Sequence, residues 1–512
     1  MRDVITCCAV AVACAMCVSS PLAGQWEGPS RALAWSPDGS CLLFEPDGWM
    51  LGVACYRPAT GRSEMLLAMD WGLSHETPAF AWTEDGRTAV VAHHVAEEPS
   101  TIRVHCIPIA DVTQRRSFAV TVPDGRAESA NLSLVVRGDT AFLGASDLLC
   151  LDLRHGAVTS RASAIQDMDF AALPGGNGVA YAACPGRRSG ASGLPPWSMG
   201  RVDAATMATT ELMRFQGRDH DGRAIAPWPA FAPDGAGFAV AVYGMDTEAC
   251  DVQVWRGDVL VTTLPVLTAA TADGISGHAL GNIAWSADGN TLWVGSERYD
   301  DASHWSLWQL PLGGTPAREI PLAVGSRTRC IGACAPPALA LSPEARHAAV
   351  AAGSLDTRIV EVATGKVSKV SPPEPRPIVV HVLPSLALLL QAWQTDLEHF
   401  RDVLRLVPRT GENAMALLAL LRGSCDVVIT EHAVRADEHA AAAAAGVEMA
   451  TSLIGCRLLW LPLHPAAATP VAWPLMAVTR RQAPPLIEGL VVWLRRFGNR
   501  HALWKAGFVP MR

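Results

Sequence analysis

The sequence predicts a mainly β chain with a C-terminal α/β domain. The phrase NIAWSADGNTLWVG, at residues 282–295, returns in altered form as LAWSPDGSCLLF at residues 33–44. A polar, glycine-containing turn between two short apolar runs predicts antiparallel strands. The repetition stops near Val370, and the remaining sequence alternates short apolar strands with helical patterns, which predicts a layered α/β domain.

Length and charge set the first limits. The chain has 512 residues, half of them apolar, so it is long enough for two or more domains with buried cores. Its formal charge is −8; from Pro377 onward 13 Lys/Arg stand against 10 Asp/Glu (+3), so the first 376 residues carry −11. Nucleic-acid binding needs a basic surface, so we expect no nucleic-acid partner.

Residues 1–24 predict a signal peptide. Arg2 precedes an apolar run from Val4 to Val18, and small residues follow through Gly24. The run is too short to span a bilayer, and no later stretch predicts a transmembrane span. We therefore expect an extracytoplasmic protein, periplasmic or secreted. Cys14 is a candidate lipid-attachment site, although Ala11 stands where a leucine is usual.

Ten cysteines follow the leader. In an oxidising compartment Cys330 and Cys334 are close enough in sequence to close a small disulfide loop. The alternative is that most of the ten are small buried side chains. None has the paired CxxC spacing of a zinc site.

The clearest repeat unit runs from residue 282 to residue 322. An apolar strand ends at Trp285, and Ser286–Gly289 supplies a turn in which Asp288 bonds to the backbone and Gly289 accepts positive φ. Three further strands follow. Four short antiparallel strands repeated at roughly 40 to 60 residues predict β-propeller blades.

Similar turns mark the other units. The clear ones are Trp35–Gly39, Trp82–Gly86, Phe231–Gly235 and Leu341–Glu344, and the weaker ones lie at 132–153 and 170–202. We therefore predict a seven-bladed β-propeller over residues 25–370, or a six-bladed one if the weak pair is a single unit. The repeated tryptophans are interpreted as core wedges. His93 and His94 with Glu97 and Glu98 are interpreted as solvated loop residues rather than as a metal site.

These turns resemble those of TolB-like and WD-type repeats. The resemblance covers about Gln25 to Val370, strongly in five units and faintly in two. It implies a propeller that binds other proteins, and it implies no reaction.

The last quarter follows a proline-rich linker at residues 371–377. Beyond it PIVVHVL, VLRLV and DVVIT predict strands, and helical patterns fall between them at 385–400, 414–421 and 436–445. GCRLLWLPL and PLMAVT predict two more strands before a helix at 484–497. This alternation predicts a mainly parallel sheet.

Two stretches of this region resemble PstS-type phosphate-binding proteins. LRGSCDVVIT resembles part of their first lobe, and KAGFVP near the end resembles their C-terminus. The resemblance implies a single periplasmic-binding-protein-like lobe over residues 378–512. Its oxyanion-binding positions correspond here to Ser385, Thr410, Gly411, Asn413 and Thr430.

This lobe departs from the family in charge and in length. Glu412 and Glu431 place negative charge where an anion would sit, and one such contact at ~4 Å costs about 4 kcal/mol at an effective dielectric of ~20. After residue 465 the chain returns directly, so the second lobe is absent. We expect a truncated, degenerate lobe that binds a small anion weakly.

The sequence therefore favours an exported, non-enzymatic binding or scaffold protein with an envelope protein as its partner. The first alternative is an oxyanion-binding component related to ABC transport. The second is a propeller-linked hydrolase, which is disfavoured because no GxSxG follows Pro377. We predict no catalytic residue, no cofactor and no metal.

Overall fold

The computed structural model describes residues 32–510 with internal gaps. The residues not described are 1–31, 47–51, 69–77, 96–97, 123–131, 145–147, 163–167, 173–177, 184–196, 204–205, 217–223, 226–228, 244–249, 268–276, 300–301, 327–337, 353–354, 372, 374–375, 397–403, 461–469, 482, 497–502, 504–507 and 511–512. The predicted signal peptide, Cys14, and the predicted Cys330–Cys334 pair all lie outside the described residues.

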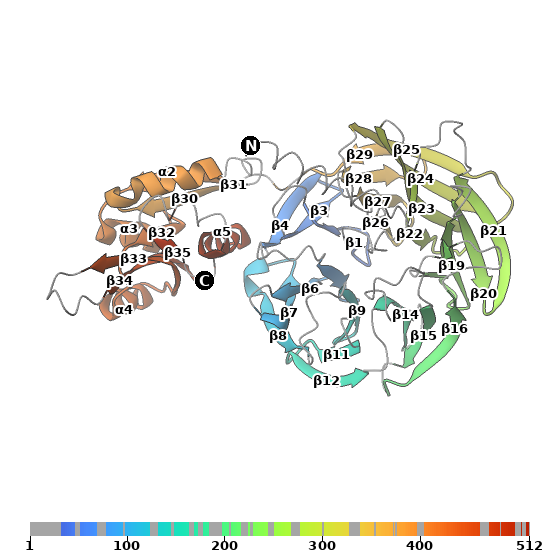
Figure 1. Cartoon of the computed structure of the whole chain (residues 1–512), viewed down its shortest axis with the longest axis horizontal. Helices are drawn as coiled ribbons and strands as arrows, with labels where there is room; N and C mark the ends of the chain where they lie inside the picture. Colours follow the sequence, from blue (N-terminus) through green and yellow to red (C-terminus); the bar gives the residue numbers. More distant parts are fainter. Residues whose placement is uncertain are drawn as a thin grey trace, which may run out of the picture. The chain divides into compact units, whose positions relative to one another are not determined.

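The chain divides into two compact units, each described by itself. One contains Met1–Leu33 and Ala130–Ser368, and the other contains Ala34–Ser129 and Lys369–Arg512. Within the described residues the first unit holds five antiparallel sheets in chain order (Figure 1). Their strands are β9 (Ser133–Arg137), β10 (Thr140–Gly144), β11 (Leu148–Asp152), β12 (Ala157–Ala162); β13 (Met168–Ala172), β14 (Gly178–Ala183), β15 (Trp197–Asp203), β16 (Thr209–Phe215); β17 (Ala224–Ile225), β18 (Ala230–Phe231), β19 (Gly237–Tyr243), β20 (Cys250–Arg256), β21 (Val259–Leu267); β22 (Gly277–Trp285), β23 (Thr291–Tyr299), β24 (Ala302–Pro311), β25 (Arg318–Ser326); and β26 (Ala338–Leu341), β27 (His347–Ala352), β28 (Leu355–Glu361), β29 (Lys366–Lys369).

Successive sheets of this unit pack on one another through shared apolar clusters. Phe142 and Tyr181 join the β9–β12 and β13–β16 sheets, and the next interface contains Phe215 and Phe238. Trp293 lies in the cluster between the β22–β25 and β26–β29 sheets and is 1% exposed. Every sheet in the middle of this series therefore buries both faces against its neighbours, as the propeller-type repeats predict.

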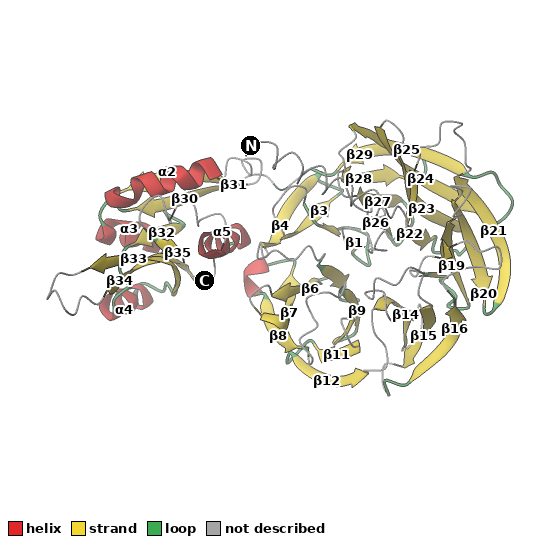
Figure 2. Cartoon of the chain, viewed as in Figure 1, coloured by secondary structure: helices red, strands yellow, loops and turns green. Residues whose placement is uncertain are grey.

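The second unit contains two more four-stranded antiparallel sheets. They are formed by β1 (Leu33–Trp35), β2 (Leu42–Phe44), β3 (Gly52–Arg57), β4 (Arg62–Ala68); and β5 (Ala79–Trp82), β6 (Thr88–Val95), β7 (Glu98–Pro108), β8 (Arg116–Thr121), with the 3-10 helix η1 (Val112–Gln114) between β7 and β8. The described part of the chain is thus mainly β, as predicted (Figure 2).

The same unit contains the α/β region. Its six-stranded sheet has the order β31-β30-β32-β34-β33-β35. The elements are β30 (Arg376–Val382), η3 (Pro384–Leu386), α2 (Ala387–Asp396), β31 (Leu404–Thr410), α3 (Asn413–Leu421), β32 (Val427–Thr430), α4 (Ala436–Ala444), β33 (Met449–Trp460), β34 (Pro470–Arg480), α5 (Pro485–Arg496) and β35 (Val509–Pro510). The strands and helices expected from apolar periodicity are present.

The expectation of a mainly parallel sheet is wrong. β30 pairs in parallel with β31 and β32, but the β32–β34, β33–β34 and β33–β35 pairs are antiparallel. The physical reason is the short connection: nine residues separate the end of β33 from the start of β34, fewer than a parallel crossover needs, so the second strand runs back along the first. The sheet is mixed.

Both faces of this sheet are covered by helices. Leu389 and Trp393 of α2 and Leu490 of α5 belong to one buried cluster, and Leu417 and Leu420 of α3 belong to another. Helix α5 also lies against β4, the last strand of the β1–β4 sheet, and Met65 of β4 is buried in the α2–α5 cluster. At the predicted linker, Ser63 Oγ donates to the backbone carbonyl of Ser371 at 2.5 Å.

None of the helices described here has both the length and the apolar character needed to cross a bilayer.

Candidate functional site

The repeated turn has the geometry that its sequence predicts. Ser286 Oγ donates to Asp288 Oδ1 at 2.5 Å, and the same carboxylate oxygen accepts from the backbone N–H of Asn290 at 3.0 Å. Gly289 has φ 69°, a conformation that glycine adopts without strain. Ser36 with Asp38, and Thr83 with Asp85, make the same side-chain bond at 2.6 and 2.7 Å.

The hydroxyl bond lowers the carboxyl pKa in all three turns. For Asp38, Asp85 and Asp288 the pKa lies below its ordinary 3.8, and the largest cause is the hydrogen bond from the serine or threonine two residues earlier. The turn at Leu341–Glu344 departs from the others because Ala345 occupies the glycine position at φ 51°.

Two of the repeated tryptophans join successive sheets. Trp285 Nε1 donates to the carbonyl oxygen of Ala230 on β18 at 2.9 Å, and Trp82 Nε1 donates to that of Ala34 on β1 at 3.0 Å. Trp82 is 7% exposed. These tryptophans therefore also hydrogen-bond to the preceding sheet, which their interpretation as core wedges did not predict.

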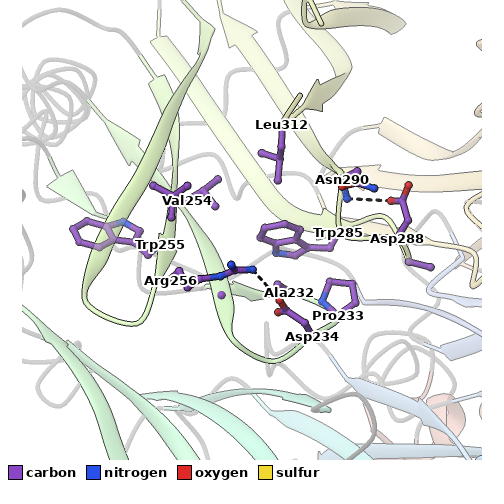
Figure 3. Close-up of a pocket in the computed structure, with 14 residues that line it drawn as sticks. Ala232, Pro233, Asp234, Val254, Trp255, Arg256, Trp285, Asp288, Asn290 and Leu312 are labelled. Carbon is purple, nitrogen blue, oxygen red and sulfur yellow. Dashed lines mark hydrogen bonds and ion pairs between the residues drawn. The ribbon is translucent and has the colours of Figure 1, made fainter. Parts of the chain in front are cut away.

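A groove of about 580 Å³ opens between the β17–β21 and β22–β25 sheets. Figure 3 shows its walls: the repeated turns at Asp234 and Asp288, the hairpin of β20 and β21 that carries Trp255, and the indole of Trp285. Its lining residues are Ala232, Pro233, Asp234, Gly237, Val254, Trp255, Arg256, Val261, Trp285, Ala287, Asp288, Gly289, Asn290 and Leu312.

The charged groups of the groove are paired. Arg256 donates from its guanidinium to Asp234 Oδ2 at 3.1 Å. The pKa of Asp234 is lowered, first by the backbone N–H of Ala236 and then by the positive charge of Arg256. Asp288 is held by Ser286 and Asn290.

Apolar side chains extend the groove toward solvent. Trp255 packs edge-on against Phe215, with ring centroids 5.9 Å apart. Val261 lines the groove and is 59% exposed, and Val259 at the start of the same strand is 62% exposed. Trp255, Val259 and Val261 were not predicted from the sequence as binding residues. The signal was present, because Val259, Leu260 and Val261 put apolar groups on both faces of one strand.

The residues predicted to bind an oxyanion lie at the carboxyl ends of β30, β31 and β32. Ser385 Oγ donates to Glu431 Oε2 at 3.4 Å, and Gly411 N–H donates to the carbonyl of Val382 at 3.2 Å. Thr410 ends β31 beside Val382 and is exposed.

The two remaining predicted residues meet at His432. Asn413 Nδ2 contacts His432 Nε2, and Thr430 Oγ1 accepts from the backbone N–H of His432 at 3.3 Å. Thr430 is completely buried. The parallel strands thus bring four of the five predicted residues into contacts at one sheet edge, but these contacts are within the lobe itself.

Sequence reasoning missed His381, which lies beside these residues on β30. It is 8% exposed, and neither ring nitrogen has a hydrogen-bond partner among the described residues. A Cβ placed on Gly411 would lie 2.7 Å from His381 Nε2, so the imidazole sits against that glycine. Burial, and then the charge of Arg409, lowers the pKa of His381.

A second histidine group lies on the β5–β8 sheet. The interpretation of His93 and His94 as solvated loop residues is wrong, because both lie on β6 and His94 is 8% exposed. Cross-strand pairing places them against β7, where His93 Nε2 lies 3.0 Å from His105 Nε2. Burial lowers the pKa of His93 to about 4 and that of His105 well below its ordinary 6.5. Glu97 is outside the described residues.

No protein-family model matches the sequence, and no curated protein matches it. Solved structures do match. A chain in the crystal structure of the mitotic checkpoint complex is 15% identical, with a TM-score of 0.42, covering 64% of this chain and 87% of that one. The Dos1 propeller is 10% identical, with a TM-score of 0.39 and coverages of 68% and 86%.

A third match is the Cps50 (Swd1) β-propeller domain of Myceliophteria thermophila. It is 13% identical, with a TM-score of 0.32, covering 52% of this chain and 93% of that one.

Proposed function

We propose that this chain is an exported, non-enzymatic binding protein whose antiparallel sheets present the groove at Trp255 and Val261 to an envelope protein. The groove supports the proposal because it combines an exposed valine, a half-buried tryptophan and an arginine held by Asp234. Tryptophan and arginine are the residues most enriched at the centres of protein interfaces. Paired charges at the rim would orient a partner while the apolar strip supplies binding free energy.

Site-specific photocrosslinking in envelope extract tests this function. A photoreactive phenylalanine at Val261 is expected to give one dominant crosslinked protein, and Trp255→Ala in the same chain is expected to abolish it. The matched control is the same probe at Val158, which is 45% exposed on β12. Equal crosslinking from Val158 and Val261, or a crosslink that survives Trp255→Ala, would refute the proposal.

Export rests on the leader at residues 1–24. The expected result is an extracytoplasmic protein whose mature N-terminus lies near Gly24, or near Cys14 if a lipid is attached. Cell fractionation with N-terminal sequencing decides between these forms, and a cytosolic protein beginning at Met1 would contradict export.

We further propose that the seven antiparallel sheets described within residues 25–370, six of four strands and one of five, are blades of one propeller and that residues 378–512 form a PstS-like lobe. The recurrence of one turn geometry in sheets of both units supports the first part. Limited proteolysis tests it, because a closed ring is expected to yield no stable fragment that ends inside residues 25–370. A stable fragment beginning near Ala130 would refute it.

The second candidate function is oxyanion binding by the lobe, as a component related to ABC transport. One observation favours it: His381, whose two ring nitrogens have no hydrogen-bond partner within the described part of the chain, lies at the strand ends with the predicted residues. Calorimetric titration with phosphate and sulfate is the test. Heat that disappears in Thr430→Ala supports this function, and no heat at millimolar ligand removes it.

A further inference from the structure

Two imidazole rings on the β5–β8 sheet face each other edge to edge. His93 Nε2 and His105 Nε2 are 3.0 Å apart, the ring planes differ by 4°, and the ring centroids are 5.2 Å apart. Because the centroids are further apart than the nitrogens, the Nε2-bearing edges are turned toward one another. Two nitrogens in this position either share one hydrogen bond or act as adjacent ligands of one metal ion.

Each ring is oriented through its other nitrogen. His93 Nδ1 lies 2.8 Å from the carbonyl oxygen of His94, which can only accept, so Nδ1 carries the proton and Nε2 carries a lone pair. His105 Nδ1 lies 2.8 Å from Ser117 Oγ. Metal-binding histidines almost always donate their second ring N–H to an oxygen in this way.

The hydroxyl of Ser117 distinguishes two states of the pair. When it donates to His105 Nδ1, the His105 proton is on Nε2 and is donated to His93. When it accepts from His105 Nδ1–H, both Nε2 atoms present lone pairs to each other. The proton only moves between the nitrogens of one ring, so the charge of the pair is the same in both states. Ser117 is exposed, so packing does not fix its hydroxyl.

We propose that His93 and His105 form a two-histidine binding site for a divalent transition metal, with Zn²⁺ as the ion it takes. Zinc–nitrogen bonds are about 2.0–2.1 Å long, so nitrogens 3.0 Å apart subtend about 95° at the metal, between the square and tetrahedral angles. Imidazole nitrogen is a good ligand for zinc. This metal site contains no residue of the groove or of the predicted oxyanion site, so the proposal is independent of the proposed function.

Two features limit the affinity of the site. The described residues contain no group of three or more His, Cys, Asp or Glu side chains placed to hold a metal, so water must complete the coordination. The positive charges of Arg103 and Arg115 also act on the pair and oppose the binding of a cation. We therefore expect micromolar rather than nanomolar binding.

Zinc titration of the metal-stripped, full-length protein tests the site. One equivalent of Zn²⁺ is expected to raise the melting temperature, and X-ray absorption at the zinc edge is expected to show two imidazoles in a nitrogen/oxygen shell without sulfur. A sulfur shell, or no binding at millimolar zinc, would overturn the proposal. The absorption measurement needs only the wild-type chain, so it decides the matter even if a variant fails to fold.

Variants then locate the ligands. His93→Gln and His105→Gln are each expected to lower zinc affinity at least tenfold, because each removes one of two protein ligands. His439→Gln is the matched control, since His439 is an exposed histidine on α4. Unchanged zinc affinity in both folded variants, or an equal loss in His439→Gln, would place the metal elsewhere.

Discussion

Trp285 donates its indole N–H to the backbone carbonyl of Ala230 at 2.9 Å and thereby joins β22 to β18 of the preceding sheet. The bond is repeated by Trp82 and Ala34 in the other unit at 3.0 Å. A wedge that is also a hydrogen-bond donor fixes the distance between strands of two successive sheets, because the indole can satisfy only a carbonyl placed at the right separation.

Trp285→Phe is expected to lower the free energy of unfolding by about 1–2 kcal/mol, because it leaves the Ala230 carbonyl without its donor. Urea unfolding measures the loss. Trp255→Phe is the control: its indole donates to Gln253, two residues away, at 3.3 Å, and this local bond does not join two sheets, so a smaller loss is expected. An equal loss in the two variants would mean that ring size, and not the bond between sheets, is what matters.

Ala345→Gly is expected to stabilise the protein by about 0.5–1 kcal/mol. Ala345 has φ 51° at a position where the other turns have glycine, and left-handed backbone costs a non-glycine residue roughly 1–2 kcal/mol. The reciprocal change, Gly235→Ala at φ 66°, should destabilise by a similar amount. Thermal unfolding of both variants gives the signs, and two shifts of the same sign would contradict the argument.

Acid is expected to destabilise the β5–β8 sheet through its buried histidines. The unfolded chain binds a proton at His93 near pH 6.5 and the folded chain only near pH 4, so stability is full above pH 6.5 and falls as the pH drops toward 4. Between pH 6.5 and 5 the loss for His93 is about 2 kcal/mol. Urea unfolding with a chelator present measures it.

His93→Gln should flatten this pH dependence, because glutamine does not titrate. The same slope in the variant and the wild type would show that other groups cause it.

Gly411→Ala is expected to destabilise the α/β region by about 1–2 kcal/mol. Its new Cβ would lie 2.7 Å from His381 Nε2, and His381 is too buried to move freely. The double variant Gly411→Ala/His381→Ala relieves the clash, so the two substitutions should not be additive. Urea unfolding of the two single variants and the double variant completes the cycle, and strict additivity would exclude this contact as the cause.

Arg480→Met is expected to cost about 1–2 kcal/mol, whereas Arg481→Met should cost less than about 0.5 kcal/mol. The Arg480 guanidinium donates to the carbonyls of Leu420 and Leu421 at 2.8–3.1 Å and so caps the C-terminal end of α3. Arg481 pairs with Glu448 at an exposed site, where an ion pair contributes little. Thermal unfolding compares the two neighbours, and an equal loss would contradict the capping role.

Local chemistry explains which features the sequence could predict. Asp288 and Gly289 form their turn with residues at most a few positions away, so the motif carries its own structure. The strand order of the α/β sheet, by contrast, depends on pairing between segments that are far apart in the sequence. Apolar periodicity locates β33 and β34 but does not give their direction, and that direction makes the sheet mixed.

Long-range pairs were harder to foresee for the same reason. His93 and His105 are twelve residues apart in sequence, and the register between β6 and β7 brings them together. Trp308 donates to Ser296 at the same spacing and at 3.0 Å in another sheet. Aligning the repeats on their turns would therefore have placed the two histidines together, since Ser296 and His93 lie equally far from their Asp-Gly turns.

The packing of α5 on β4 has a consequence for solubility. β4 is an outermost strand, and such a strand offers free amide and carbonyl groups that can recruit a strand from another molecule. Helix α5 packs against this edge strand and removes Met65 from water. Deleting the chain beyond Arg481 would uncover both together and would also strip the α/β region of its Leu490 contacts, so a shortened protein should form fibrous or amorphous aggregates.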